Sequence, residues 1–111
     1  MAHQKLITKA VETALAKNPL YSQENNQDPR IIVKFFNPCG LGTWYITEGE
    51  KQENGDWLLF GLCCIREPEL GYVLLSDLER LRLPFGMRIE RDMHFSGTLS
   101  KARRIENHLS A

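Results

Sequence analysis

Residues 69–95 read ELGYVLLSDLERLRLPFGMRIERDMHF, the part of the chain with the densest set of chemically capable side chains. The residue types here predict, in order, a loop at 66–71, a short strand at 72–75, a capped helix near 76–83 and a second strand at 87–95. Ser76 and Glu79 have the spacing of a capping box, in which each side chain accepts a hydrogen bond from the other's backbone N–H. Pro84 and Gly86 then mark the turn that ends the helix.

The elements before this stretch follow from hydrophobic periodicity. We predict a helix over 6–18, a polar loop at 20–29, strands at 31–36, 43–48 and 57–65, and a polar connection at 49–56. Alternation places Trp44 and Ile46 on one face of the sheet and Tyr45 on the other. Residues 57–65 are apolar on both faces, which is typical of a central strand covered on both sides. A second copy of the chain is one candidate for that cover, so a homodimer is one expectation.

The length and composition indicate a single globular domain. The 111 residues suit one domain over 1–111, with a helical tail at 97–111. We therefore predict an α+β fold with an N-terminal helix, a short helix, a C-terminal helix and an antiparallel or mixed sheet of about four or five strands. A hydrophobic share of 42% and a charged share of 25% exclude wholesale disorder. The zero net charge excludes a uniformly basic surface of the kind that binds nucleic acid without selectivity.

The cysteines and the apolar runs indicate a cytoplasmic protein. Cys39, Cys63 and Cys64 form neither a C-x-x-C pair nor an even disulfide framework, which favours a reducing compartment. The first ten residues hold no apolar core of signal-peptide length. No apolar run approaches the roughly 20 residues that span a bilayer, so we expect no membrane contact.

Three polar residues of the predicted 87–95 strand are candidates for chemistry. Alternation places Glu90, Asp92 and His94 on one face, where two carboxylates and an imidazole could bind a metal or share a proton transfer. A solvated face of an edge strand is the simpler interpretation. The opposite face reads as core and consists of Ile89, Met93 and Phe95 with Arg91 among them. An inward Arg91 would need a carboxylate partner such as Glu48 or Glu69.

A binding surface is the second kind of candidate site. We expect it over the turn that includes Glu69 and Tyr72, together with Tyr45 and with Glu90, Arg91, Asp92 and His94. Within the aromatic group of Trp44, Tyr45, Trp57 and Tyr72, we predict Tyr45 to be the most exposed. The charge is also split, because acidic residues dominate 48–79 and basic residues dominate 80–104. Phosphate groups of a nucleic acid would contact the basic region through Arg80, Arg82, Arg88, Lys101, Arg103 and Arg104.

No complete catalytic or cofactor motif is present. The sequence contains no glycine-rich phosphate loop, no nucleophile elbow and no H-E-x-x-H pattern. We therefore expect no cofactor, and the absence of a motif favours a protein without catalytic activity.

Several separate words of the sequence carry a resemblance to a known family. They are VKFFNP from Val33, TWYITE from Thr43, LFGLC from Leu59, PELGYV from Pro68, SDLE from Ser76 and PFGMRIERDMHF from Pro84. In this order they resemble the bacterial family catalogued as domain of unknown function 2958. Cys64 departs from it, since the family often has an aspartate there, and so does the tail after Phe95. The resemblance implies a protein of plasmids, integrative elements or phages, near genes for DNA maintenance, transfer or defence, and it implies no catalytic residue.

The expected function is an accessory role in a mobile element, by binding a bacterial protein partner through the 66–95 surface. One alternative is a DNA- or RNA-binding module that uses the basic 80–104 region. The other is a metal-dependent hydrolase or nuclease that uses Glu90, Asp92 and His94.

Overall fold

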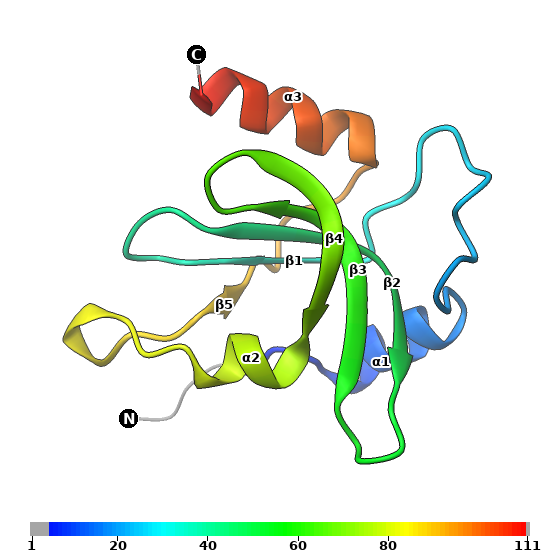
Figure 1. The fold of residues 1–111 in the computed structure, drawn as a ribbon, viewed down its shortest axis with the longest axis horizontal. Helices are drawn as coiled ribbons and strands as arrows, with labels where there is room; N and C mark the ends of the chain where they lie inside the picture. Colours follow the sequence, from blue (N-terminus) through cyan, green and yellow to red (C-terminus); the bar gives the residue numbers. More distant parts are fainter. Residues whose placement is uncertain (1–4, 111) are drawn as a thin grey trace.

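The computed structural model describes residues 5–110 and shows a five-stranded antiparallel sheet with helices on both faces (Figure 1). Its elements are α1 (Lys9–Ala16), β1 (Val33–Phe36), β2 (Thr43–Lys51), β3 (Trp57–Cys64), β4 (Pro68–Leu74), α2 (Leu75–Arg80), the 3-10 turn η1 (Pro84–Gly86), β5 (Glu90–Arg91) and α3 (Leu99–Ser110). The strand order is β4-β3-β2-β1-β5, and every neighbouring pair is antiparallel. The predicted α+β class is therefore confirmed, with an antiparallel rather than a mixed sheet.

Side chains of the sheet form two separate apolar clusters, one on each face. Trp44 and Ile46 pack in the cluster that includes residues of α1 and α2, whereas Tyr45 packs in the cluster under α3. This confirms the predicted alternation along β2. Figure 1 shows α3 on the far side of the sheet from α1 and α2. Residues of β3 are thus buried on both faces, with Leu59 in one cluster and Leu62 in the other, whereas Phe60 is only partly buried.

A β-bulge interrupts the pairing of the two longest strands. The register of β2 against β3 shifts between Ile46 and Glu48, and Gly61 stands opposite Ile46. A bulge places an extra residue in one strand and turns the following side chain away from its alternating position. Thr47 and Glu48 consequently line the same depression on the α3 face.

Several predicted boundaries are wrong. Helix α1 is shorter than 6–18 and begins after Thr8, whose hydroxyl accepts from the backbone N–H of Val11 at 3.3 Å. Strand β2 continues to Lys51, so the connection covers 52–56 rather than 49–56. The predicted loop at 66–71 is mostly strand, because β4 pairs with β3 from Pro68 onward. Pairing with an apolar neighbour overrides the turn propensity of Pro68 and Gly71.

The predicted capping box is also wrong. Helix α2 begins at Leu75 without a side-chain cap of its own, and the Ser76 hydroxyl donates to the Asp56 carboxylate at 2.6 Å. Asp56 also accepts from the backbone N–H of Ser76 at 3.1 Å, so a residue from the β2–β3 connection satisfies the helix start. The helix ends at Arg80 rather than near 83, and Leu81, just after it, is 41% exposed.

The predicted 87–95 strand is reduced to the two residues of β5. Ile89 is buried in the α1/α2 cluster, and Phe95 packs against the α3 cluster instead. Met93 is 66% exposed, which contradicts its prediction as a core residue. The segment therefore passes from one face of the sheet to the other, and a regular strand cannot do that.

Asp28 holds the beginning of α3. Its carboxylate accepts from the backbone N–H of Ser100 at 2.8 Å and from the hydroxyls of Thr98 and Ser100 at 2.7 Å each. These bonds lower the pKa of Asp28 below its ordinary value of 3.8, and the bonds from the Thr98 and Ser100 side chains have the largest effect. A negative charge at a helix N-terminus is also favoured by the helix dipole.

The lowered pKa of Asp28 predicts a pH dependence with a definite sign. A carboxyl whose folded pKa is depressed stabilises the fold above about pH 4 and loses that contribution as the pH falls through the folded pKa. We expect Asp28→Asn to be less stable than wild type at pH 6 and to approach it at lower pH. Urea denaturation at a series of pH values measures this. Glu12→Gln on α1 is the matched control, and equal stability losses at pH 6 and pH 2.5 in the Asp28 variant would contradict the assignment.

Candidate functional site

A groove opens on the α3 face of the sheet beside the edge strand β4, and we call it the β4 groove. Its volume is about 390 Å³. Its walls are the 21–29 segment, Thr47 and Glu48 of β2, Phe60 of β3, Leu70 and Tyr72 of β4, and Leu99 of α3. Helix α3 covers the neighbouring part of this face over Tyr45 and Leu62, so the groove is the part of the face that the helix leaves open.

A buried carboxylate fastens the outer wall of this groove. Glu48 is 4% exposed, and its two oxygens accept from the backbone N–H groups of Tyr21 and Gln23 at 2.8 Å each. The side-chain amide of Gln23 donates to the carbonyl oxygens of Thr47 at 2.8 Å and Arg30 at 2.9 Å. Buried polar groups that are fully bonded give a rigid local structure. The 21–29 segment is thus held in one position although it contains no helix or strand.

Three aromatic side chains line up across the groove. The Tyr72 hydroxyl donates to the Tyr21 hydroxyl at 3.3 Å, and the rings of Phe60 and Tyr72 are 4.9 Å apart. The hydrogen bond with Tyr21 is the main cause that raises the pKa of Tyr72 above its ordinary value of 10. Tyr21 has a backbone φ of 72°, which is uncommon for a bulky residue and persists only where surrounding contacts impose it. The Tyr21 N–H donates to Glu48 and its C=O accepts from the backbone N–H of Glu24, and these bonds are such contacts.

The outer edge of β4 is open. The strand pairs with β3 on one side, and among residues 5–110 no strand pairs with it on the other. Such an edge presents unpaired backbone N–H and C=O groups to a further strand. Leu70 and Tyr72 are 48% and 50% exposed on the groove side of this edge. An edge with exposed apolar side chains is the arrangement that proteins usually avoid unless it binds something.

Acidic residues outnumber basic ones around this edge, where Arg66 is also exposed just before β4. Glu24 and Glu48 line the groove, and no Lys or Arg lines it in the part of the chain that the structure describes. Glu67 and Glu69 are exposed where β4 begins. A cationic partner would therefore be attracted to the edge, and an acidic one repelled.

A comparison with models of known protein families assigns the chain to one family. The model of the family described as "Protein of unknown function (DUF2958)" matches residues 6–107. The chain belongs to this family. The match includes every residue that lines the β4 groove of this DUF2958 protein. No curated protein and no solved structure matches the chain.

The structure places only part of the predicted binding surface at this site. Glu69 and Tyr72 lie on β4, at the open edge and the groove. Tyr45, in contrast, is 0% exposed, so its prediction as an exposed aromatic residue is wrong. The Tyr45 hydroxyl donates to the Glu106 carboxylate of α3 at 2.7 Å, and burial followed by this bond raises the pKa of Tyr45. Helix α3 covers Tyr45. Periodicity predicts this helix but does not show which part of the sheet it packs on.

The predicted group at 90–94 does not line the β4 groove, and β5 is the opposite edge strand from β4. Asp92 pairs with Lys34 at 3.4 Å and accepts from the backbone N–H of His94 at 2.9 Å. Arg91 is partly exposed and donates to the backbone carbonyls of Lys5 and Leu6 rather than projecting into the core. Neither predicted carboxylate partner fits, since Glu48 accepts from Tyr21 and Gln23 and Glu69 lies on β4, the opposite edge strand from β5.

The six predicted phosphate contacts lie on two different faces. Arg80 ends α2, and Arg82 and Arg88 flank η1, next to the α1/α2 cluster. Lys101, Arg103 and Arg104 lie on α3, which covers the other face. Arg88 donates to the Glu79 carbonyl at 3.0 Å, and Arg80 lies 3.8 Å from Asp77. The basic 80–104 region is therefore not one surface.

The described residues contain no group of three His, Cys, Asp or Glu side chains that could hold a metal ion. Glu90, Asp92 and His94 are all among the residues searched, so the predicted metal trio is not assembled. Within the same part of the chain, no helix has the length and apolar character needed to cross a membrane.

Most residues of the β4 groove carry no signal in the sequence that predicts a site. Tyr21 and Gln23 fall in a segment that reads only as a polar loop, and Glu48 was considered only as a partner for Arg91. Phe60 lies in a run that is apolar on both faces, where no pattern separates covered from open positions. One signal was present: a Tyr in a loop of otherwise polar residues is an exposed aromatic residue that could have been marked as part of a binding site.

Proposed function

We propose that this protein is a non-catalytic binding module that takes an extended, basic segment of a partner protein as an additional strand along β4. The open edge of β4 is the observation that carries this proposal. On the family resemblance, the partner belongs to the DNA maintenance, transfer or defence machinery of a plasmid, integrative element or phage, and binding occurs in the bacterial cytoplasm.

Main-chain hydrogen bonds supply the affinity in this form of recognition. An extended peptide beside a free sheet edge pairs with the backbone, and side chains on alternate positions enter neighbouring pockets. Every second residue of a docked segment would lie beside Leu70 and Tyr72, because cross-strand neighbours share a face of the sheet. The groove lined by Phe60 and Tyr21 offers room for one such apolar side chain.

The charge of the site selects the partner. Lys or Arg residues that flank the apolar position would lie near Glu67, Glu69 and Glu24. Exposed charges mainly guide association and orientation, and each exposed pair contributes little affinity. Binding should therefore weaken moderately, not collapse, between low and physiological salt.

The proposal predicts the outcome of a peptide selection. Random peptides displayed on phage and selected on the immobilised protein should be enriched in segments that alternate apolar with basic residues. Leu70→Lys and Tyr72→Lys should each weaken a selected peptide by about tenfold or more, as measured by fluorescence polarisation. The control is Met93→Lys, because Met93 is 66% exposed and follows β5, which is the opposite edge strand of the sheet from β4.

Hydrogen exchange locates the bound segment. Peptide binding should slow exchange of backbone amides within 68–74, since these gain partners. The proposal would be contradicted if the selected peptides were acidic. It would also be contradicted if a selected peptide bound wild type and both lysine variants with equal affinity.

A further inference from the structure

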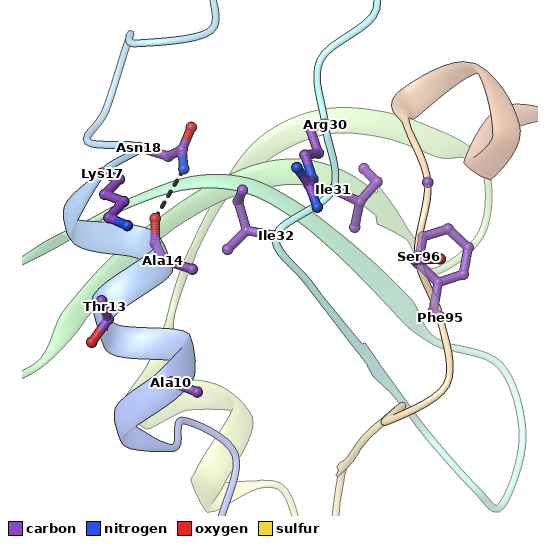
Figure 2. Close-up of a pocket in the computed structure, with 11 residues that line it drawn as sticks. Ala10, Thr13, Ala14, Lys17, Asn18, Arg30, Ile31, Ile32, Phe95 and Ser96 are labelled. Atoms are coloured by element: carbon purple, nitrogen blue, oxygen red, sulfur yellow. Dashed lines mark hydrogen bonds between the residues drawn. The ribbon is translucent and has the colours of Figure 1, made fainter.

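A second depression lies between α1 and the 95–97 segment, and we call it the α1 cleft (Figure 2). Its volume is about 450 Å³, which is within the range of small-molecule sites. Figure 2 shows Ala14 on one side, Phe95 on the other, and Ile32 between them. The cleft is separate from the β4 groove, and the two share no lining residue.

Both charged residues that line this cleft are positive. Lys17 at the end of α1 and Arg30 before β1 both line it, and no Asp or Glu does within residues 5–110. In that described range neither cation has an ion-pair partner, and the two ion pairs found there involve Lys34 and Arg80. Lys101 adds a third cation nearby, because its ammonium group donates to the carbonyl of Ser96, a lining residue, at 2.6 Å.

The backbone of Arg30 is fixed before any ligand arrives. The Gln23 side chain accepts from its N–H at 2.7 Å and donates to its C=O at 2.9 Å. Arg30 also forms a bridge to Thr98, and the N–H of Ile31 donates to the Gly97 carbonyl at 2.9 Å. The position from which the guanidinium extends is thus set relative to the opposite wall of the cleft.

We propose that the α1 cleft binds a small organic oxyanion, a phosphate monoester or a carboxylate carried on an apolar body. The guanidinium of Arg30 matches the paired oxygens of either group, and Lys17 adds a second charge. The apolar body lies over Ala10, Ala14 and Ile32. This site is independent of partner binding at β4.

The two cations are not equivalent in this site. The carboxyl end of a helix carries a partial negative charge, and Lys17 at the end of α1 offsets it. Less of the Lys17 charge therefore remains for a ligand. Arg30 follows no helix, so its removal has the larger effect.

Titration of the ¹⁵N-labelled protein with phenyl phosphate, benzoate and neutral benzyl alcohol tests the proposal. We expect saturable amide shifts confined to 10–18, 30–32 and 95–97 for at least one anion and none for the alcohol. The anion that binds with the higher affinity shows whether the site takes a phosphate monoester or a carboxylate. Arg30→Gln should weaken binding by about tenfold and Lys17→Gln by a smaller factor, in line with the loss of a charge-assisted hydrogen bond.

Lys9→Gln is the matched control, since Lys9 is exposed on α1 and does not line the cleft. It should bind as wild type does. The spectra themselves report whether each variant is folded. Three results would each overturn the proposal. They are no saturable shifts with either anion at millimolar concentration, binding of benzyl alcohol as tight as that of the anions, and equal affinity of Arg30→Gln and wild type. Peptide binding at β4 should be unchanged in Arg30→Gln, so failure of one site leaves the other testable.

Discussion

Gly61→Ala is expected to lower the free energy of unfolding by about 3 kcal/mol or more. A Cβ atom at this position would lie 1.9 Å from the backbone oxygen of Tyr45 and 2.8 Å from the Cα of Ile46. Both atoms belong to the neighbouring strand at the bulge, so no flexible side chain can move aside. The strands β2 and β3 would have to separate locally, or the bulge would have to move.

Gly71 supplies a closely matched control. It pairs with Gly61 across β3 and β4, and a Cβ there would meet no atom within 4 Å. Gly71→Ala should leave stability unchanged or raise it by about 0.5–1 kcal/mol, because alanine loses less backbone entropy on folding. Thermal or urea unfolding of the two variants measures the contrast. Similar stability of Gly61→Ala and Gly71→Ala would contradict the bulge geometry.

Gln23→Ala is the second change with a large expected effect, and we expect it to cost about 2–4 kcal/mol of stability. Gln23 is 7% exposed. Its side chain forms hydrogen bonds with the backbone N–H and C=O of Arg30 and with the carbonyl of Thr47. Its removal leaves three backbone groups without their partner. Loss of buried hydrogen-bond partners is among the few mechanisms that give effects of this size.

The same substitution should weaken both proposed sites. Gln23 lines the β4 groove in the same wall as Tyr21, and it also fixes the backbone of Arg30 in the α1 cleft. Urea denaturation measures the stability loss, and affinities measured at a temperature where the variant is folded report the two sites. Asn25→Ala, an exposed position in the same segment, is the control. A Gln23 variant as stable as this control would show that the hydrogen bonds do not hold the segment.

Particular residues show how far the sequence predicts this fold. Trp44 and Tyr45 are adjacent, and alternation correctly assigns them to opposite faces, because a strand has a strict period of two. The same rule fails after Thr47, where the bulge adds one residue, and again after Arg91, where the strand ends. Periodicity holds only while the pairing is regular, and the positions where regular pairing ends are decided by the neighbouring strand.

The helix start at α2 illustrates a second limit. Ser76 and Glu79 have the spacing of a capping box, yet Ser76 bonds Asp56, which is twenty residues earlier in the chain. A partner brought near by the fold competes with the local one, and a charged acceptor forms the stronger hydrogen bond. The spacing of residues in the sequence indicates only the hydrogen bonds that are possible within the helix itself.

The sequence by itself determined the α+β class, the helices near the two ends of the chain, the face assignment along β2 and the interior position of β3, because each follows from the pattern of apolar residues in one segment. It also carried the family resemblance that the family model confirms. The tertiary structure alone decided which side chains meet. The 69–95 stretch is divided between an open edge at β4, a helix capped by Asp56 and a short β5 whose arginine holds residues 5 and 6. Tyr21, Glu48 and Tyr72 form one groove although up to 51 residues separate them, since contact between distant segments depends on how the sheet bends and pairs.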